Sequence, residues 1–465
     1  MGRSIQCRSF DAYITFAFLW VAHAERAGTN HIYIDESSSG RTQGSDEECS
    51  QYAEQWAPFS GPLDQGMYPW SPNVQGNDRD DVLYGTAYTQ RRIWEHQHPR
   101  DCSGAKFLAM YNWPIGMGAL LHFLGRALGL ALHLGRILVV ADEAYGPESM
   151  ALWPGPGGMP WHERGLCEGD KSWECWFQPL THCAVGPDLM ALWPSDLSLF
   201  RRDNFTWHYV PTMFQHMVRR CSRVKRSMEF YWWHAQAVTY IIRFNSRTRV
   251  LLDDLRRKLL HVRHKGSHGL HKLRNIPRGS VAVHVRHGDK VEEVPSVTFD
   301  KYYSSAQRLA VGDQTVPVLD PNFADSGRSF NYALDKFAGR SIFLSTEDPE
   351  VVHEAVVFAE PGVRRELAWG VAFTRENRTD VDVKTMRQER GYGQATLQSL
   401  LNLELSLEAD AWVCTLSSNW CQLIDELRMT VARKASAPFI NLVHEGFRRG
   451  NDCFAFQKCY IYVFR

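Results

Sequence analysis

The sequence lacks an excess of charge of either sign: its 465 residues hold 52 Lys and Arg against 52 Asp and Glu. A balanced chain does not generate the positive field that attracts nucleic acid or acidic membrane surfaces, so we predict no nucleic-acid partner. Internal repeats are also lacking. The eleven cysteines form no C-x-x-C pair, which disfavours zinc ribbons and thioredoxin-like redox chemistry.

Long apolar segments are scarce as well. Arg3 and Arg8 precede an apolar run at 12–22, and Ala22–Ala24 then offers small residues at an A-x-A site. This layout is typical of a signal peptide, here cleaved before Glu25. The run is about half of the roughly 20 residues that a spanning helix needs, so an uncleaved anchor is the alternative. We expect residues 1–24 to be one or the other, and no other segment to span a bilayer.

The cysteines suit an oxidising compartment. Removal of Cys7 with the signal leaves ten, an even number that predicts disulfides without fixing their pairing. N-glycosylation acceptors at Asn204 and Asn377 agree with entry into the secretory pathway.

Composition divides the remaining chain into three parts. Residues 25–104 are rich in Ser, Gly, Pro, Asp and Gln without periodicity, which predicts a stem or poorly ordered extension. Residues 105–275 form an N-terminal α/β domain with a Trp- and Cys-rich insertion at 143–227. The basic stretch 261–274 is interpreted as a solvated linker, with a polyanion-binding patch as the alternative. Residues 276–465 form a second α/β domain.

Periodicity places the elements. The strands are expected at 106–111, 136–140, 280–285, 341–344 and 411–415, and the helices at 119–134, 230–260, 299–309, 349–358, 396–409 and 419–433. The strand–helix–strand run at 106–140 is a βαβ unit, which requires a parallel sheet. We therefore predict an α/β fold with two Rossmann-like domains facing a cleft.

The first candidate site follows the strand at 280–285. Ligands bind beyond the carboxyl ends of such strands. There Arg286 can hold a diphosphate with two hydrogen bonds and stabilise the charge that grows on a leaving β-phosphate. Asp289 can orient Arg286, and Lys290 can pair with a carboxylate. The alternative is a salt-bridge cluster at a strand end.

Two further strand ends suit phosphate. Ser417 and Ser418 stand at a helix start, where hydroxyl and amide groups bind anions, although an ordinary helix cap explains both serines equally well. Gly116 and Gly118 leave backbone amides open to a phosphate, but tight packing also explains these glycines.

Three segments, in this order along the chain, resemble the motifs of one family. Val281–Lys290 (V-A-V-H-V-R-H-G-D-K) resembles its H-V-R-R-T-D-K type hallmark, and Phe343–Pro349 resembles its second motif, a strand ending in T-D-D-P. Glu408–Cys421 resembles its third, A-D-x-x-V-C-T-x-S-S-x-x-C. The chain thus resembles a divergent member of the alpha-1,6-fucosyltransferase family, the core N-glycan fucosyltransferases and their rhizobial nodulation relatives.

The resemblance implies a GT-B-like fold and transfer of fucose from GDP-fucose to a glycan or glycoprotein, with inversion. It implies no metal and no cofactor, and a place in the Golgi lumen, with secretion as the alternative.

The resemblance also assigns roles to residues. Arg286 would hold the β-phosphate with support from Asp289, His284 would contact guanosine, and Ser418 would bind the diphosphate. Glu293, assisted by Lys290, would be the base, with Glu292 as the alternative. The remaining donor-site residues that we infer are Ser417, Gly116, Gly118, Tyr302, Glu347, Asp348 and Asn402.

The chain departs from the family pattern at four positions. His287 replaces an arginine, Gly288 a threonine and Glu347 an aspartate, and Asn402 stands where the family has an aspartate that contacts guanine. Glu404 on the same helix is a possible substitute; otherwise the donor differs. We also expect no SH3-like C-terminal module. A protein O-fucosyltransferase-like enzyme, a non-catalytic carbohydrate- or nucleotide-binding protein and a secreted structural or interaction protein remain alternatives.

Overall fold

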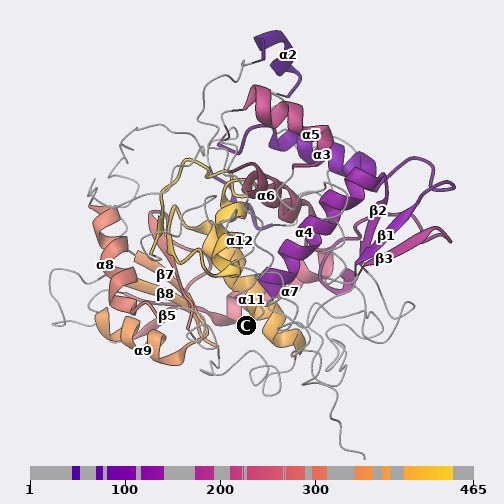
Figure 1. The fold of residues 1–465 in the computed structure, drawn as a ribbon. Coiled ribbons are helices and arrows are strands. Elements are labelled where there is room, and N and C mark those ends of the chain that lie inside the picture. Colours follow the sequence, from indigo (N-terminus) through magenta and orange to yellow (C-terminus); the bar gives the residue numbers. More distant parts are fainter. Residues whose placement is uncertain are drawn as a thin grey trace, which may run out of the picture. The chain divides into compact units, whose positions relative to one another are not determined.

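Two sheets made mainly of parallel strands organise the fold. Figure 1 shows a computed structural model of the chain. It describes residues 44–52, 70–76, 81–110, 117–140, 173–192, 210–222, 224, 228–264, 267, 269–287, 296–311, 341–359, 369–376 and 392–442. The predicted signal or anchor and both glycosylation acceptors lie outside these residues.

The smaller sheet contains the predicted βαβ unit. Its strands are β1 (Phe107–Met110), β2 (Ile137–Val140) and β3 (Leu189–Leu192), in the order β2-β1-β3. All three run parallel, with Phe107 opposite Ile137 and Leu189. Helix α4 (Met117–Leu134) connects β1 to β2, so the predicted strand–helix–strand unit is confirmed.

The larger sheet has the order β10-β9-β6-β7-β8-β4-β5. Its strands are β4 (Leu260–Arg263), β5 (Leu270–Lys272), β6 (Ser280–Val285), β7 (Ser341–Thr346), β8 (Gly370–Thr374), β9 (Ala411–Cys414) and β10 (Phe439–Asn441). The five strands from β10 to β8 run parallel, whereas β4 and β5 join antiparallel beside β8. Taken along the chain, the parallel strands β6 to β10 follow the spatial order 3-2-1-4-5, which is that of a doubly wound nucleotide-binding sheet.

Helices cover both faces of the larger sheet. Alternate residues of β6 point to opposite faces: Val281, Val283 and Val285 pack under α8 (Phe299–Ala310) and α9 (Pro349–Phe358), and Ala282 packs under α11 (Tyr392–Glu408). Figure 1 shows α8 and α9 on one side of β7 and β8, and α11 on the other.

The other helices in the described residues are α2 (Asp46–Ser50), η1 (Pro72–Val74), α3 (Thr86–Gln97), η3 (Trp173–Cys175), α5 (Thr212–His216), η5 (Met217–Cys221), α6 (Glu229–Ile241), α7 (Ser246–Leu259) and α12 (Asn419–Arg428).

Helix α4 corrects one prediction. It has 18 residues with a mean hydropathy of 1.4, so by length and composition it is able to cross a membrane, contrary to our expectation for segments after residue 24. Of this helix, 83% is buried inside the protein. It packs against β1, β2, α6 and α12, and a helix covered on all sides needs apolar residues all round.

The predicted stem is wrong for residues 81–104. This region forms α3, which packs on α6, where Gln90 Nε2 donates to the Gln236 carbonyl at 2.9 Å. Farther upstream, Trp70 and Val74 are buried in the main apolar core. Polar composition did not reveal this region because its few aromatic and aliphatic residues supply the packing face.

The predicted linker at 261–274 is also wrong. Strand β4 is fully buried and pairs with β8, while β5 forms the exposed edge of the same sheet. A domain boundary at 275/276 would cut these two strands from their sheet. Residues 44–465 form one compact unit instead. The cleft between two domains stays a prediction.

Two helix boundaries differ from the prediction. The helix expected at 230–260 is two helices, because the chain is extended at Phe244 and Asn245 caps α7 by accepting from the Thr248 amide at 2.8 Å. Helix α12 ends at Arg428 rather than 433, because the Ala432 amide turns back to the Leu427 carbonyl. The other predicted elements are confirmed within a few residues at either end.

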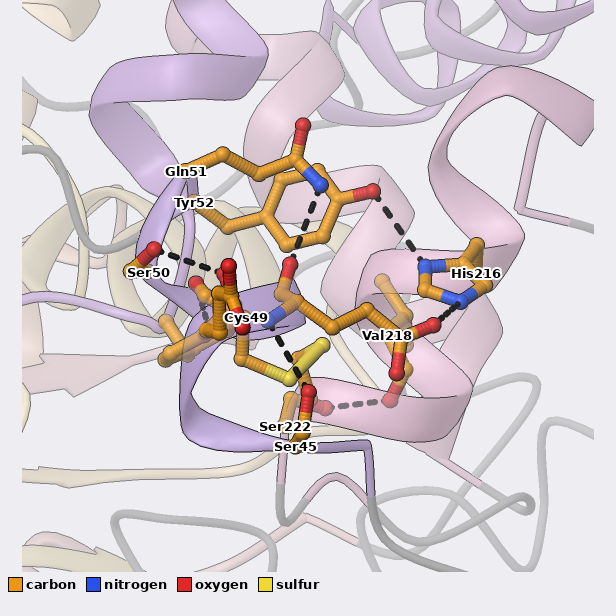
Figure 2. The surroundings of a disulfide bond; sticks show 12 residues. Ser45, Cys49, Ser50, Gln51, Tyr52, His216, Val218 and Ser222 are labelled. Carbon is orange, nitrogen blue, oxygen red and sulfur yellow. Dashed lines mark hydrogen bonds and ion pairs between the residues drawn. A yellow bond between two sulfur atoms is a disulfide. The ribbon is translucent and has the colours of Figure 1, made fainter.

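Disulfides join distant segments. Between described cysteines, Cys49–Cys221 and Cys102–Cys183 are such pairs, and Cys414–Cys421 closes a short loop. Figure 2 shows the first, which ties α2 to η5 across 172 residues of sequence. Beside it, His216 pairs with Glu48 at 2.6 Å and with the Tyr52 hydroxyl at 3.2 Å. The segment at 44–52 is therefore fixed to the folded unit by covalent and polar contacts.

Replacing Cys49 and Cys221 together by serine should lower the free energy of unfolding by about 2–4 kcal/mol, because the bond closes a very long loop in the unfolded chain. Denaturant titration measures the loss. His216→Asn is the control and should cost about 0–1 kcal/mol, since its ion pair is partly exposed. Equal stability of the double variant and the wild type would contradict the prediction.

Candidate functional site

The carboxyl ends of β9, β6 and β7 carry the three motifs side by side. In a doubly wound sheet, the switch point lies between the first and fourth strands in chain order, which here are β6 and β9. Arg286 follows β6, Glu347 follows β7, and Ser417 and Ser418 follow β9. Three segments that lie far apart in sequence thus meet at the edge where such sheets bind ligands.

Arg286 is held by a carboxylate from the neighbouring strand. Val285 lies opposite Thr346 in the β6–β7 ladder, so the next residues, Arg286 and Glu347, also face each other. Arg286 Nη1 donates to Glu347 Oε1 at 2.5 Å and to the His287 carbonyl at 2.9 Å. Both side chains keep only about a fifth of their surface exposed, 20% and 17%. The carboxylate that orients the guanidinium among the described residues is therefore Glu347.

His287 occupies the next position in the same register. Its amide donates to Glu347 Oε1 at 2.7 Å, its Nδ1 lies 2.7 Å from Asp348 Oδ2, and its Nε2 lies 3.1 Å from the Val297 carbonyl oxygen. Burial favours the neutral ring, but the bonds to Asp348 and Val297, with the charges of Asp348 and Glu347, outweigh it and raise the pKa of His287.

His284 is a buried neutral imidazole. Its Nδ1 lies 3.1 Å from the Ser345 hydroxyl, and burial together with the Arg286 charge lowers the pKa of His284 to about 3. Its Nε2 makes no hydrogen bond within the described part of the chain. A buried ring nitrogen without a partner suits a polar ligand group.

Tyr302 locks two strand ends together. It is 1% exposed and comes from α8. Burial raises the pKa of Tyr302 to about 12, opposed by hydrogen bonds with the Thr415 side chain and the Arg286 backbone. The phenol therefore joins the end of β6 to the end of β9, and its contact with the donor stays a prediction.

A disulfide joins the end of β9 to the first turn of α12. The Cys414–Cys421 disulfide brackets the turn that holds Ser417 and Ser418, and Ser418 stands at the helix N-cap. The Ser418 side chain makes no cap hydrogen bond to α12, so an ordinary cap does not explain this serine. The amides of a first helical turn have no partner inside the helix and favour anions.

Gly118 lies in the first turn of α4, close to the first turn of α12. A Cβ atom at Gly118 would lie 3.0 Å from the Asn419 carbonyl carbon and 3.1 Å from the Trp420 nitrogen. The first turns of α4 and α12 thus pack directly on each other. Close packing, the alternative that the sequence left open, accounts for this glycine.

Asn402 is engaged by neighbouring residues of the protein. Its Oδ1 accepts from the Thr374 hydroxyl at 2.9 Å, and its Nδ2 donates to Glu376 Oε1 at 3.2 Å. Thr374 ends β8, on the sheet face that α11 covers, and Glu376 follows two residues later. Asn402 therefore positions the carboxylate of Glu376.

Glu404 is not the substitute that the sequence suggested. Its carboxylate is fully buried and forms ion pairs with Arg249 and with Arg256, the latter at 2.5 Å, and it also accepts from the Ser71 amide at 3.2 Å. These contacts bind α11 to α7 and to the segment around residue 71. The role of Glu404 is structural.

Four predicted site residues lie outside the described residues: Gly116, Asp289, Lys290 and Glu293, with the alternative base Glu292. Their roles stay predictions.

Among the described residues, two groups of side chains have metal-ligating atoms within 4.8 Å of one another. In the first, the sulfurs of Cys102 and Cys183 are joined in a disulfide and are not thiolate ligands. In the second, His122 Nε2 lies 3.0 Å from Glu426 Oε2, beside His234, and all three are buried. The positive charge of Arg126 acts on His234, which disfavours a further cation there. In this second group a hydrogen bond joins α4 to α12, and the His234 ring from α6 stacks on the His122 ring.

Sequence reasoning missed two features of the site. Glu376 gave no signal, because it lies outside the three motifs and reaches Asn402 only through the fold. The Cys414–Cys421 disulfide could have been predicted. Its two cysteines flank the two serines with C-x6-C spacing, where a predicted strand meets a predicted helix.

No protein-family model and no curated protein matches the chain. Among solved structures, it is similar to fucosyltransferase NodZ from Bradyrhizobium, with 13% identity over 69% of this chain and 92% of that chain and a TM-score of 0.30. It is also similar to NodZ alpha-1,6-fucosyltransferase co-crystallized with GDP (14%, 69%, 91%, TM-score 0.29) and soaked with GDP-fucose (14%, 69%, 92%, TM-score 0.31). Likeness at these TM-scores does not establish a shared fold.

Glu347→Gln should weaken binding of guanosine diphosphate about tenfold, because the guanidinium of Arg286 loses its charged partner and its fixed direction. Isothermal titration calorimetry measures the dissociation constant. Glu350→Gln, three residues along the chain and exposed on α9, is the matched control and should bind like the wild type. Equal affinities for both variants would mean that Glu347 does not orient a binding group.

Proposed function

We propose that this protein is a glycosyltransferase that moves fucose from GDP-fucose to a glycan acceptor with inversion. The observation that carries the proposal is the meeting of three motifs at the ends of β9, β6 and β7. A guanidinium, a helix start and a buried neutral histidine lie along this edge. Each motif alone has a structural explanation, but their convergence at the switch point suits a nucleoside diphosphate.

In the proposed reaction, the acceptor oxygen attacks the anomeric carbon of fucose. The new carbon–oxygen bond forms as the bond to the β-phosphate oxygen breaks, and the acceptor proton passes to a base, for which the sequence offers Glu293. Negative charge then grows on the leaving GDP. In this proposal Arg286 and the first-turn amides of α12 neutralise this charge, and pre-oriented donors of this kind stabilise the transition state most. The proposed transfer therefore uses no metal ion.

Guanine recognition is proposed to involve Glu376. Guanine presents two adjacent N–H donors, and a carboxylate offers two acceptor oxygens to meet them. The Asn402 amide holds Glu376 at the end of β8, two strands from His284. In the family that the motifs resemble, a carboxylate at the position of Asn402 contacts guanine. Here Glu376, which follows β8, would supply that carboxylate.

The proposed compartment is the lumen of the secretory pathway. The disulfides between described cysteines support it, because such bonds persist in oxidising compartments. An acceptor that is itself a secretory glycan or glycoprotein agrees with this place. A folded protein domain as acceptor is the nearest alternative, and an array of both acceptor classes separates the two.

Arg286→Ala should lower GDP release from GDP-fucose in the presence of acceptor about 10²–10³-fold, because a preorganised charge on the leaving group is lost. Arg286→Lys should recover only part of the rate, since an ammonium group cannot form the two-point contact. Arg308→Ala, exposed on α8, is the control and should leave the rate unchanged.

No GDP release with any acceptor, for wild type and Arg286→Ala alike, would contradict the proposed enzyme. Tight GDP binding without turnover would instead indicate a nucleotide-binding protein on this fold.

Glu376→Gln should reduce the preference for GDP over ADP about tenfold or more, because the acceptor of both guanine N–H groups is lost. Competition binding with the two nucleotides measures the preference. Glu404→Gln should leave the preference unchanged and lower stability by about 1–3 kcal/mol, since Arg256 and the partly buried Arg249 each lose one of two carboxylate partners. A changed preference in Glu404→Gln, with none in Glu376→Gln, would reverse the assignment.

A further inference from the structure

The ring of His287 lies between two hydrogen-bond acceptors. Nδ1 faces Asp348 Oδ2 at 2.7 Å, and Nε2 faces the Val297 carbonyl oxygen at 3.1 Å. A carbonyl only accepts. Asp348 presents a carboxylate oxygen, and its other oxygen accepts from the Glu350 amide at 2.8 Å where it caps α9.

Two acceptors require two donors. A neutral imidazole has one N–H, so it would turn a lone pair toward one of these oxygens; an imidazolium donates to both. The contacts therefore select the charged ring, which joins the end of β6 to the chain entering α8 and to the cap of α9.

The backbone of His287 belongs to the same assembly as Arg286. The His287 amide and Arg286 Nη1 both donate to Glu347 Oε1, and Arg286 Nη1 also donates to the His287 carbonyl. A rotation of the His287 backbone would disturb these two described partners of the guanidinium. The direction of Arg286 thus depends on whatever fixes His287.

The described charges that face the ring favour its protonated form. Asp348 and Glu347 face it from the junction of β7 and α9, Arg286 lies beside it directly after β6, and the segment entering α8 contributes the Val297 carbonyl. Among these described groups, the imidazolium and the guanidinium are two cations that meet two carboxylates.

We propose that His287, as an imidazolium bridging Asp348 and Val297, is the positioning residue that aims Arg286 at the donor diphosphate. The role rests on the proposed donor site, but the charge and order of the two side chains are measurable without any donor.

The direction of the pH dependence follows from the raised pKa. A base whose pKa is higher in the folded protein than its ordinary value of about 6.5 stabilises the folded arrangement fully below that value. The contribution is lost as the pH rises through the folded pKa of His287. Arg286 should therefore be well aimed in mildly acidic solution and released in alkaline solution.

Calorimetry of GDP binding between about pH 5.5 and about pH 9 tests the binding role. Wild-type affinity should fall about tenfold across the range, His287→Arg should keep the affinity of the acidic form throughout, and His287→Gln should show that of the alkaline form throughout. Titration of GDP itself cancels, because all three proteins meet the same ligand. A wild-type profile parallel to that of His287→Gln would overturn the proposal.

Nuclear magnetic resonance of the ligand-free protein keeps the two proposals distinguishable. The His287 ring should titrate above about pH 6.5, and the Arg286 Nε–H signal should lose its order over the same range in wild type but not in His287→Arg. A ring that titrates lower, or an Arg286 signal indifferent to it, would overturn the positioning role. If the His287 ring and the Arg286 Nε–H signal behave as expected but GDP does not bind, the result would count against the donor site alone.

Discussion

The parallel register of β6 and β7 is the constraint on which the site depends. Because Val285 lies opposite Thr346, the two residues that follow each strand must also meet: Arg286 with Glu347, then His287 with Asp348. A shift of one residue would separate both pairs and turn each side chain to the other face of the sheet. The buried strands fix this register through their valine, isoleucine and leucine side chains, so apolar packing sets the geometry of the charged site.

The junction between β6 and β9 is fixed from the other side. Tyr302 joins the two strand ends from α8, and the Cys414–Cys421 disulfide holds the serine-containing turn against α12. Contact of Gly118 with the start of α12 adds a third restraint. The guanidinium and the helix start therefore need little reorganisation to meet a diphosphate, and a preorganised site spends less binding energy on ordering itself.

The sequence predicts the local elements of this fold well, because strand alternation, leucine spacing and the Asp348-Pro349 cap are local signals. It fails where tertiary contacts decide. Strand β4 is a buried strand despite its basic sequence, since its partner β8 is more than a hundred residues away. The charge of His287 and the carboxylate of Glu376 depend on neighbours that only the fold supplies, so neither was predictable from the sequence.

Read as charges, the departures from the motifs that these segments resemble are compatible with the chemistry proposed for this edge of the sheet. His287 stands for an arginine and is held as a cation; Glu347 stands for an aspartate and, with its longer side chain, reaches both Arg286 and the His287 amide. Asn402 lacks the carboxylate of its counterpart, yet it bonds to one from β8. Among the described residues, the buried and neutral His284 has no partner for one ring nitrogen, which suits a polar group of a ligand. These compensations support donor binding more strongly than a purely structural role for the motifs.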